Sequence, residues 1–208
     1  GGSERIGCPE GSYNNFTNQS TISSCTNCTK GKYGDQTNQS IETDACHICE
    51  KGYYCDGSIH REACPAGTYN ENTEQYNITE TCVSCQAGKY GQETAQTHES
   101  IACKICEGGY VCEGGAYRKP CFPGTYGIET NQSSHNVGCK TCERGFYCSG
   151  GDAREPCPSG KYGNKSNASS VETACNGCPL GYYCTGNTSI VICPAGRYND
   201  QSNQTSFE

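Results

Sequence analysis

The chain has 208 residues, of which 21 are cysteine and none is methionine or tryptophan, and its formal net charge is −7. Its hydrophobic residues are largely cysteine and tyrosine, so covalent cross-links must replace the ordinary apolar core. The acidic charge is scattered and no basic stripe is present, which argues against binding of nucleic acid or of an anionic membrane.

The cysteines divide the chain into a regular series of modules. Eleven modules start with Cys-x-x-Gly, and ten of them have an aromatic residue two positions after the glycine; at Cys106 that position is Val111. Long modules close at a second cysteine 17 or 18 residues later, and short modules close after six. Spacing this regular predicts a tandem repeat array.

In chain order, cysteine-rich repeats are expected at 8–63 and 64–120 (long-long-short), then at 121–156 and 157–192 (long-short). Residues 1–7 are interpreted as the tail of a preceding module and 193–208 as the start of a truncated long one, so a segment of a longer array is expected. The segments between cysteines lack the 3.6-residue apolar period of a helix. The predicted fold class is therefore small disulfide-rich repeats, an elongated rod of tandem cysteine-rich modules with short β-ribbons and little or no helix.

Each first cysteine has one natural partner before the next module begins, which predicts ten disulfides within modules. Cys193 stays unpaired in this segment, because its partner is expected beyond Glu208. We also expect the glycine at the fourth position of each module to take a positive φ, and the aromatic ring to cover the disulfide. The predicted pairs are Cys8 with Cys25, Cys28 with Cys46, Cys49 with Cys55, Cys64 with Cys82, Cys85 with Cys103, Cys106 with Cys112, Cys121 with Cys139, Cys142 with Cys148, Cys157 with Cys175 and Cys178 with Cys184.

Asn-x-Ser/Thr sequons are far more frequent than the about three that chance would give in this composition. Five of them stand ten residues after the first cysteine of a long module. Together with the disulfides, they predict a secreted or cell-surface, extracellular glycoprotein that carries N-linked glycans and no other cofactor. No apolar run is long enough to span a membrane, and no membrane contact is expected within this segment. The predicted acceptors are Asn15, Asn18, Asn27, Asn38, Asn77, Asn131, Asn164, Asn167, Asn187 and Asn203.

Other kinds of chemistry agree less well with the sequence. Two successive Cys-x-x-Cys pairs, as at Cys25–Cys28 and Cys46–Cys49, have zinc-ribbon spacing, but at Cys139–Cys142 the pair recurs without its second half. A thioredoxin-like use of these pairs would need a βαβ setting that the sequence lacks. The four histidines (His47, His60, His98 and His135) form no cluster, and no phosphate loop or nucleophile elbow is present. We therefore expect no enzyme activity, no catalytic or metal-binding residue and no small-molecule substrate.

The motifs CPEGSY, CPAGTY and CPSGKY, each followed by a long polar loop and Cys-x-x-Cys, resemble the ephrin-receptor-like cysteine-rich repeat. They are also similar to the first half of the cysteine-rich module of TNF receptors. The resemblance implies bridging of first to second cysteine within long modules, and an elongated extracellular stalk. The chain departs from the TNF-receptor pattern because its short modules hold two cysteines instead of four interlaced ones.

The first functional hypothesis is a non-enzymatic structural glycoprotein that forms a stalk, surface coat or glycosylated filament. Its expected partners are copies of itself or other surface glycoproteins. The alternative is the ligand-binding ectodomain of a cell-surface receptor. Such a site needs exposed aromatic or arginine side chains that break the repeat, and the candidates are Tyr76, Tyr117 and Arg118.

Overall fold

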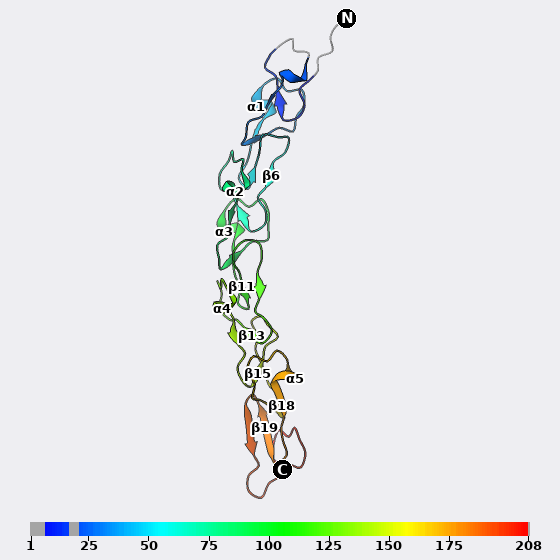
Figure 1. Cartoon of the computed structure of the whole chain (residues 1–208), viewed down its shortest axis with the longest axis vertical. Helices are drawn as coiled ribbons and strands as arrows, with labels where there is room; N and C mark the ends of the chain where they lie inside the picture. The colour runs from blue at the N-terminus through cyan, green and yellow to red at the C-terminus, as the bar shows by residue number, and fades with distance from the viewer. Residues whose placement is uncertain (1–6, 17–20, 208) are drawn as a thin grey trace. The chain divides into compact units, whose positions relative to one another are not determined.

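The computed structural model describes residues 7–16 and 21–207. The chain divides into two compact bodies. One comprises Gly1–Gln86, Tyr90–Lys104 and Gly114–Tyr117, and the other comprises Ala87–Lys89, Ile105–Glu113 and Arg118–Glu208. In the first body the labelled elements α1, β6, α2 and α3 follow one another in chain order, and in the second body β11, β13, β15 and β19 do the same (Figure 1).

The strands form two-stranded ribbons, one for each module from Cys8 to Cys178. The first strand follows the fourth-position glycine, and the second ends at the residue before the next module's first cysteine. The ribbons are β1 (Ser12–Tyr13) with β2 (Thr26–Asn27), β3 (Lys32–Tyr33) with β4 (His47–Ile48), β5 (Tyr53–Tyr54) with β6 (Glu62–Ala63), β7 (Thr68–Tyr69) with β8 (Val83–Ser84), β9 (Lys89–Tyr90) with β10 (Lys104–Ile105), β11 (Tyr110–Val111) with β12 (Lys119–Pro120), β13 (Thr125–Tyr126) with β14 (Lys140–Thr141), β15 (Phe146–Tyr147) with β16 (Glu155–Pro156), β17 (Lys161–Gly163) with β18 (Cys175–Gly177) and β19 (Tyr182–Gly186) with β20 (Ser189–Ile192).

Single helical turns precede the closing cysteine of the long modules. They are the 3-10 turn η1 (Ile22–Ser24) and the α-helical turns α1 (Glu42–Ala45), α2 (Ile78–Thr81), α3 (Glu99–Ala102), α4 (His135–Gly138) and α5 (Val171–Ala174). Side chains cap two of them: Asn77 accepts a hydrogen bond from the Thr79 amide, and Ser170 forms a capping box with Thr173.

Ten disulfides close the modules among the described residues, with sequence separations of 17 or 18 in long modules and 6 in short ones. The bridged pairs are Cys8–Cys25, Cys28–Cys46, Cys49–Cys55, Cys64–Cys82, Cys85–Cys103, Cys106–Cys112, Cys121–Cys139, Cys142–Cys148, Cys157–Cys175 and Cys178–Cys184. Cys193 is free and partly buried. These bridges and ribbons confirm the predicted fold class of small disulfide-rich repeats.

The aromatic ring of a module packs against the disulfide of the following module. Tyr69 contacts the cluster of Cys85, Ala102 and Cys103, and Tyr126 packs with the bridge of Cys142 and Cys148. The expectation that a ring covers the disulfide of its own module is wrong for these two rings, because each packs on the bridge of the next module and the small cores are shared between neighbours. Since neither module has a complete core alone, adjacent modules stabilise each other.

Backbone hydrogen bonds repeat at every junction. The first cysteine of each module from Cys28 to Cys193 donates its N–H to the carbonyl of the preceding module's fourth-position glycine, at 2.8 to 3.0 Å. These glycines all have positive φ, between 73° and 89°, as predicted. A glycine is also required sterically at Gly109, because a Cβ there would lie 2.5 Å from the amide nitrogen of Asp152, two modules further along.

Candidate functional site

A left-handed turn recurs in the long modules ten residues after the first cysteine. The residue there donates its backbone N–H to the carbonyl of the preceding module's first cysteine; for Asn131 the acceptor is Cys106, at 2.7 Å. Because this bond fixes the backbone, the side chain at the turn is presented in an equivalent way from module to module. The φ angles are 61° at Asn38, 59° at Glu74, 56° at Ala95, 61° at Asn131, 59° at Asn167 and 62° at Asn203.

Four of these turns carry a sequon asparagine, and each of the four is exposed: Asn38, Asn131, Asn167 and Asn203. Asn18 shares their position in the sequence but lies outside the described residues. Asparagine tolerates a left-handed backbone better than most residues, since its short polar side chain can hydrogen-bond locally. The same residue type therefore suits the turn and provides the amide nitrogen to which an N-linked glycan is attached.

The other sequons occupy different settings. Asn15, Asn27 and Asn164 are exposed, and Asn27 lies on β2 opposite Ser12. Asn187 is exposed at the turn between β19 and β20, with φ 52°. Asn77 is half-buried, and its side-chain oxygen accepts hydrogen bonds from the amide and hydroxyl of Thr79.

A cluster of glutamate, arginine and aromatic ring recurs in three of the four short modules. In the module at Cys142, Arg154 lies 3.0 Å from Glu143 and its guanidinium lies over Phe146, 4.7 Å from the ring centre. The corresponding clusters are Glu50, Arg61 and Tyr53, and Glu107, Arg118 and Tyr110. Arg118 therefore follows the repeat, contrary to its interpretation as a residue that breaks it.

The cluster at Glu143 also contains a tyrosine from the preceding long module. The Tyr126 hydroxyl donates to Glu143 Oε1 at 2.8 Å, beside the Arg154 contact. The hydrogen bond from Tyr126 lowers the pKa of Glu143, and the same bond together with burial raises the pKa of Tyr126. The glutamate is thus held ionised between a phenol and a guanidinium.

The two other receptor candidates are exposed tyrosines. Tyr117 has 81% of its surface accessible, and Tyr76 is half-exposed with the Lys30 ammonium 5.5 Å from its ring centre. Single exposed aromatic residues are normal on protein surfaces, so neither defines a site by itself.

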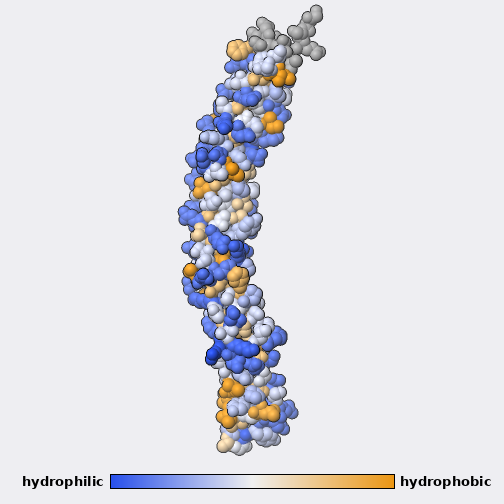
Figure 2. All heavy atoms as spheres, in the orientation of Figure 1, coloured by the Kyte–Doolittle hydropathy of each residue, from blue (hydrophilic) through white to orange (hydrophobic). Residues whose placement is uncertain are grey.

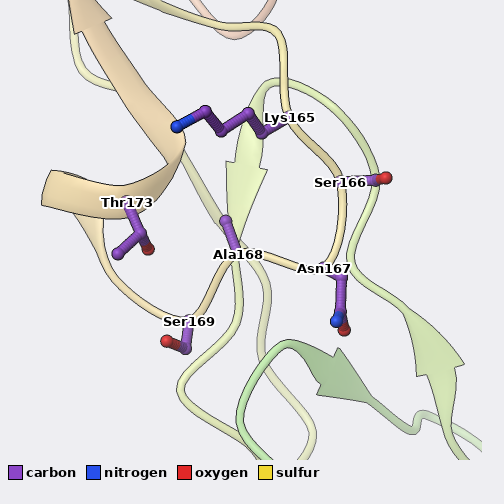
Figure 3. A pocket seen from close by; sticks show the side chains of 6 residues that line it. All are labelled: Lys165, Ser166, Asn167, Ala168, Ser169 and Thr173. Atoms are coloured by element: carbon purple, nitrogen blue, oxygen red, sulfur yellow. The ribbon is translucent and has the colours of Figure 1, made fainter.

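A shallow hollow of about 250 Å³ lies beside α5 and is lined by Lys165, Ser166, Asn167, Ala168, Ser169 and Thr173. Lys165 extends toward the helix that carries Thr173, whereas Ser166 points away from it (Figure 3). The lining offers hydroxyls, one carboxamide and one ammonium, without a carboxylate or imidazole that could act as a general base.

The cysteines of the zinc-ribbon alternative are engaged in disulfides, Cys25 with Cys8 and Cys28 with Cys46. Within residues 7–16 and 21–207, no group of three or more His, Cys, Asp or Glu side chains is placed to hold a metal ion. The histidines lie apart: His47 is 3.3 Å from Asp35, His98 is 3.5 Å from Glu71, and His135 stacks on Phe122. In the same part of the chain, none of the helices has the length and apolar character needed to cross a bilayer.

No protein-family model matches the sequence, and a search of curated proteins finds no similar sequence. The chain is a cysteine-rich repeat array, and its dense disulfides fit an extracellular or secreted protein.

Two features of this surface were missed in the sequence. The glutamate–arginine–aromatic cluster had a signal: Glu follows the first cysteine of a short module, and Arg stands three residues before the next module, as in Glu143 and Arg154. The left-handed turn had only an ambiguous signal, because an asparagine at that position is equally expected as part of a glycosylation sequon.

Proposed function

We propose that this chain is a non-enzymatic structural glycoprotein of the cell exterior, a segment of a stalk, surface coat or glycosylated filament. The observation that carries the proposal is the repetition of one junction. In every module from Cys28 to Cys193, the first cysteine donates its backbone N–H to the carbonyl of the preceding module's glycine, so the same hydrogen bond can join one module to the next throughout an array.

The exposed left-handed turns support the glycan component of the proposal. The backbone at Asn131, Asn167 and Asn203 is fixed by the same hydrogen bond to the preceding module, so the attached sugars would recur at equivalent positions. A regular glycan cover would shield a chain that has no thick core and would slow its proteolysis. The resemblance to ephrin-receptor-like repeats, which occur in extracellular stalks, agrees with this role.

Copies of this chain or other surface glycoproteins are the proposed partners. Head-to-tail or lateral contacts between repeat arrays are heterologous and need not close, so they would produce a filament or a coat. Negative-stain microscopy of native material would show fibres or a continuous layer. Monodisperse short particles, together with empty sequons in glycopeptide mass spectrometry, would refute the proposal.

The receptor alternative now depends on Tyr76 and Tyr117, of which Tyr117 is the more exposed, because Arg118 belongs to a repeated cluster. A receptor would bind a soluble extracellular ligand through this surface, and Tyr117→Ala would abolish that binding. A structural protein would instead lose neither assembly nor secretion with the same substitution.

A further inference from the structure

The fourth short module, at Cys178, lacks the polar cluster of the other three. Pro179 stands where they have glutamate, and Ile190 stands where they have arginine. Both members of the ion pair are therefore replaced together. In the other three short modules, the guanidinium of the arginine lies over the ring of Tyr53, Tyr110 or Phe146. Tyr182 is the equivalent ring in the fourth module, and an isoleucine stands at the position of that arginine.

The substitutions create an apolar face on the β19–β20 ribbon. Ile190 and Ile192, which alternate to the same side of β20, are 39% and 66% exposed; Val191, on the opposite side, is 37% exposed, and Leu180, which precedes β19, is 62% exposed. Ile192 pairs with Tyr182 and Val191 with Tyr183. Hydrophobic residues gather on this part of the second body, where Figure 1 places β19 (Figure 2). The second strands of the other short modules are Glu62–Ala63, Lys119–Pro120 and Glu155–Pro156, and each carries a charge that β20 lacks.

In the other short modules, the position of Ile190 stays exposed beside a complete following module. The other three short modules are each followed by a complete long module, yet the residues that correspond to Ile190 (Arg61, Arg118 and Arg154) are still exposed. Exposed apolar strands without edge charges are prone to pair with other chains. The apolar side chains of the β19–β20 face therefore need to be shielded from solvent and from other chains by a group other than the following module.

The same ribbon carries a sequon at its turn, and the other three short-module ribbons do not. Asn187, Thr188 and Ser189 form the sequon, whereas the residues that correspond to Asn187 are Ser58, Gly115 and Gly151. The Asn187 backbone is held on both sides: its N–H donates to the Cys157 carbonyl at 3.0 Å, and its carbonyl accepts from the Gly163 N–H at 2.7 Å. Its side chain is exposed.

We propose that an N-linked glycan on Asn187 lies over the apolar face of β19–β20 and takes the place of the missing ion pair. At a rise of about 3.3 Å per residue, Ile190 to Ile192 lie about 10 to 17 Å along the strand from Asn187, within reach of the first sugars of a glycan core. N-acetylglucosamine rings have an apolar face and a methyl group that can cover isoleucine, and hydroxyls that remain in water. This inference rests on the proposed function, because it requires a glycoprotein.

The test compares secreted proteins that lack one glycan each. Asn187→Gly removes the sequon and keeps a residue that suits φ 52°, as Gly115 and Gly151 do at the corresponding turns. The matched control, Asn131→Gly, removes a glycan from another left-handed turn. We expect a severalfold rise in binding of a hydrophobic dye, and self-association in light scattering, for Asn187→Gly alone. Adding Pro179→Glu and Ile190→Arg to that variant should restore the behaviour of the parent.

Equal dye binding by the two single variants would overturn the inference. So would self-association of the fully glycosylated parent that Ile190→Arg abolishes, because the face would then contact a second copy. Glycopeptide mass spectrometry separates this inference from the proposed function: an empty Asn187 beside occupied turns refutes only the former, whereas sequons that are empty throughout refute both.

Discussion

The close approach between a module and the module two places further along can be tested at Gly109 and Gly151, two glycines that lie beside each other at this contact. Gly109 and Gly151 have φ of 83° and 82°. A Cβ on Gly109 would lie 2.5 Å from the Asp152 amide nitrogen, whereas a Cβ on Gly151 would meet nothing within 4 Å. Alanine at either site therefore introduces the same backbone strain, but only Gly109→Ala introduces a clash.

The expected magnitudes follow from these two terms. An L-residue in a left-handed conformation costs about 1–2 kcal/mol. Alanine also has less conformational freedom than glycine in the unfolded chain, which offsets about 0.4–1 kcal/mol of that cost. Gly151→Ala should therefore lower the free energy of unfolding by about 1 kcal/mol. Overpacking adds about 1–3 kcal/mol, so Gly109→Ala should lower it by about 2–4 kcal/mol.

Guanidinium denaturation with the disulfides intact, followed by circular dichroism, measures both values. If the two variants lost the same stability, the contact between Gly109 and the module two places along would not be formed in solution. The shared backbone geometry makes Gly151→Ala a control for strain, so the difference between the variants reports the contact alone.

Three further outcomes are expected. The Thr81 hydroxyl is buried without a hydrogen-bond partner, so Thr81→Val should raise the free energy of unfolding by about 1 kcal/mol, whereas the exposed control Thr43→Val should leave the denaturation midpoint unchanged. Replacing both cysteines of the Cys157–Cys175 bridge by alanine should lower the free energy of unfolding by about 3 kcal/mol in the same assay. Replacing both cysteines of Cys142–Cys148 should lower it by about 2 kcal/mol, because the shorter loop restricts the unfolded chain less. The reverse order would contradict this. The pKa of Glu143 is lowered from 4.5, so its contribution to the free energy of unfolding is complete above pH 4.5 and is lost as the pH falls through the pKa of the folded protein. In an acid titration, Glu143→Gln should therefore lose less stability than the parent over this pH range. An unchanged profile would argue against the Tyr126 contact.

The regular spacing of the modules, their disulfide pairing and the fold class could be predicted because they depend on local cysteine spacing. Two cysteines separated by six residues, with the next module start nine residues on, leave few ways to pair. The glycine at the fourth position, as at Gly109, carried its own signal, since a recurrent glycine beside a fixed turn indicates a positive φ.

The helical turns and the shared cores could not be predicted for physical reasons. A helix such as α5, of four residues, is too short to show a 3.6-residue period. The position of Tyr69 in the sequence does not say which disulfide the ring covers, because its direction depends on how consecutive modules pack. In the structure it covers the next bridge, beside Ala102. The small size of Ala102 is explained by that ring.

The left-handed turn and the sequon are separable at Ala95, where the turn is present without the asparagine. Ala95 has φ 56° and donates to the Cys64 carbonyl as the asparagines do at the same position of other modules. Ala95→Asn would relieve the left-handed strain and, with Gln96 and Thr97, create a new sequon. Glu74→Asn would relieve the same strain, but Tyr76 then occupies the place of the serine or threonine, so no sequon forms.

Both variants should therefore gain about 1 kcal/mol in unfolding free energy when they are compared without sugars. Only Ala95→Asn should gain the mass of a glycan when it is secreted from a eukaryotic cell. Stabilisation by both substitutions would show that the turn itself selects asparagine and that the glycan adds a second use to a residue that the backbone already favours. If neither variant were stabilised, selection for the sugar alone would explain the asparagines, and the left-handed turn would follow from the packing of the modules.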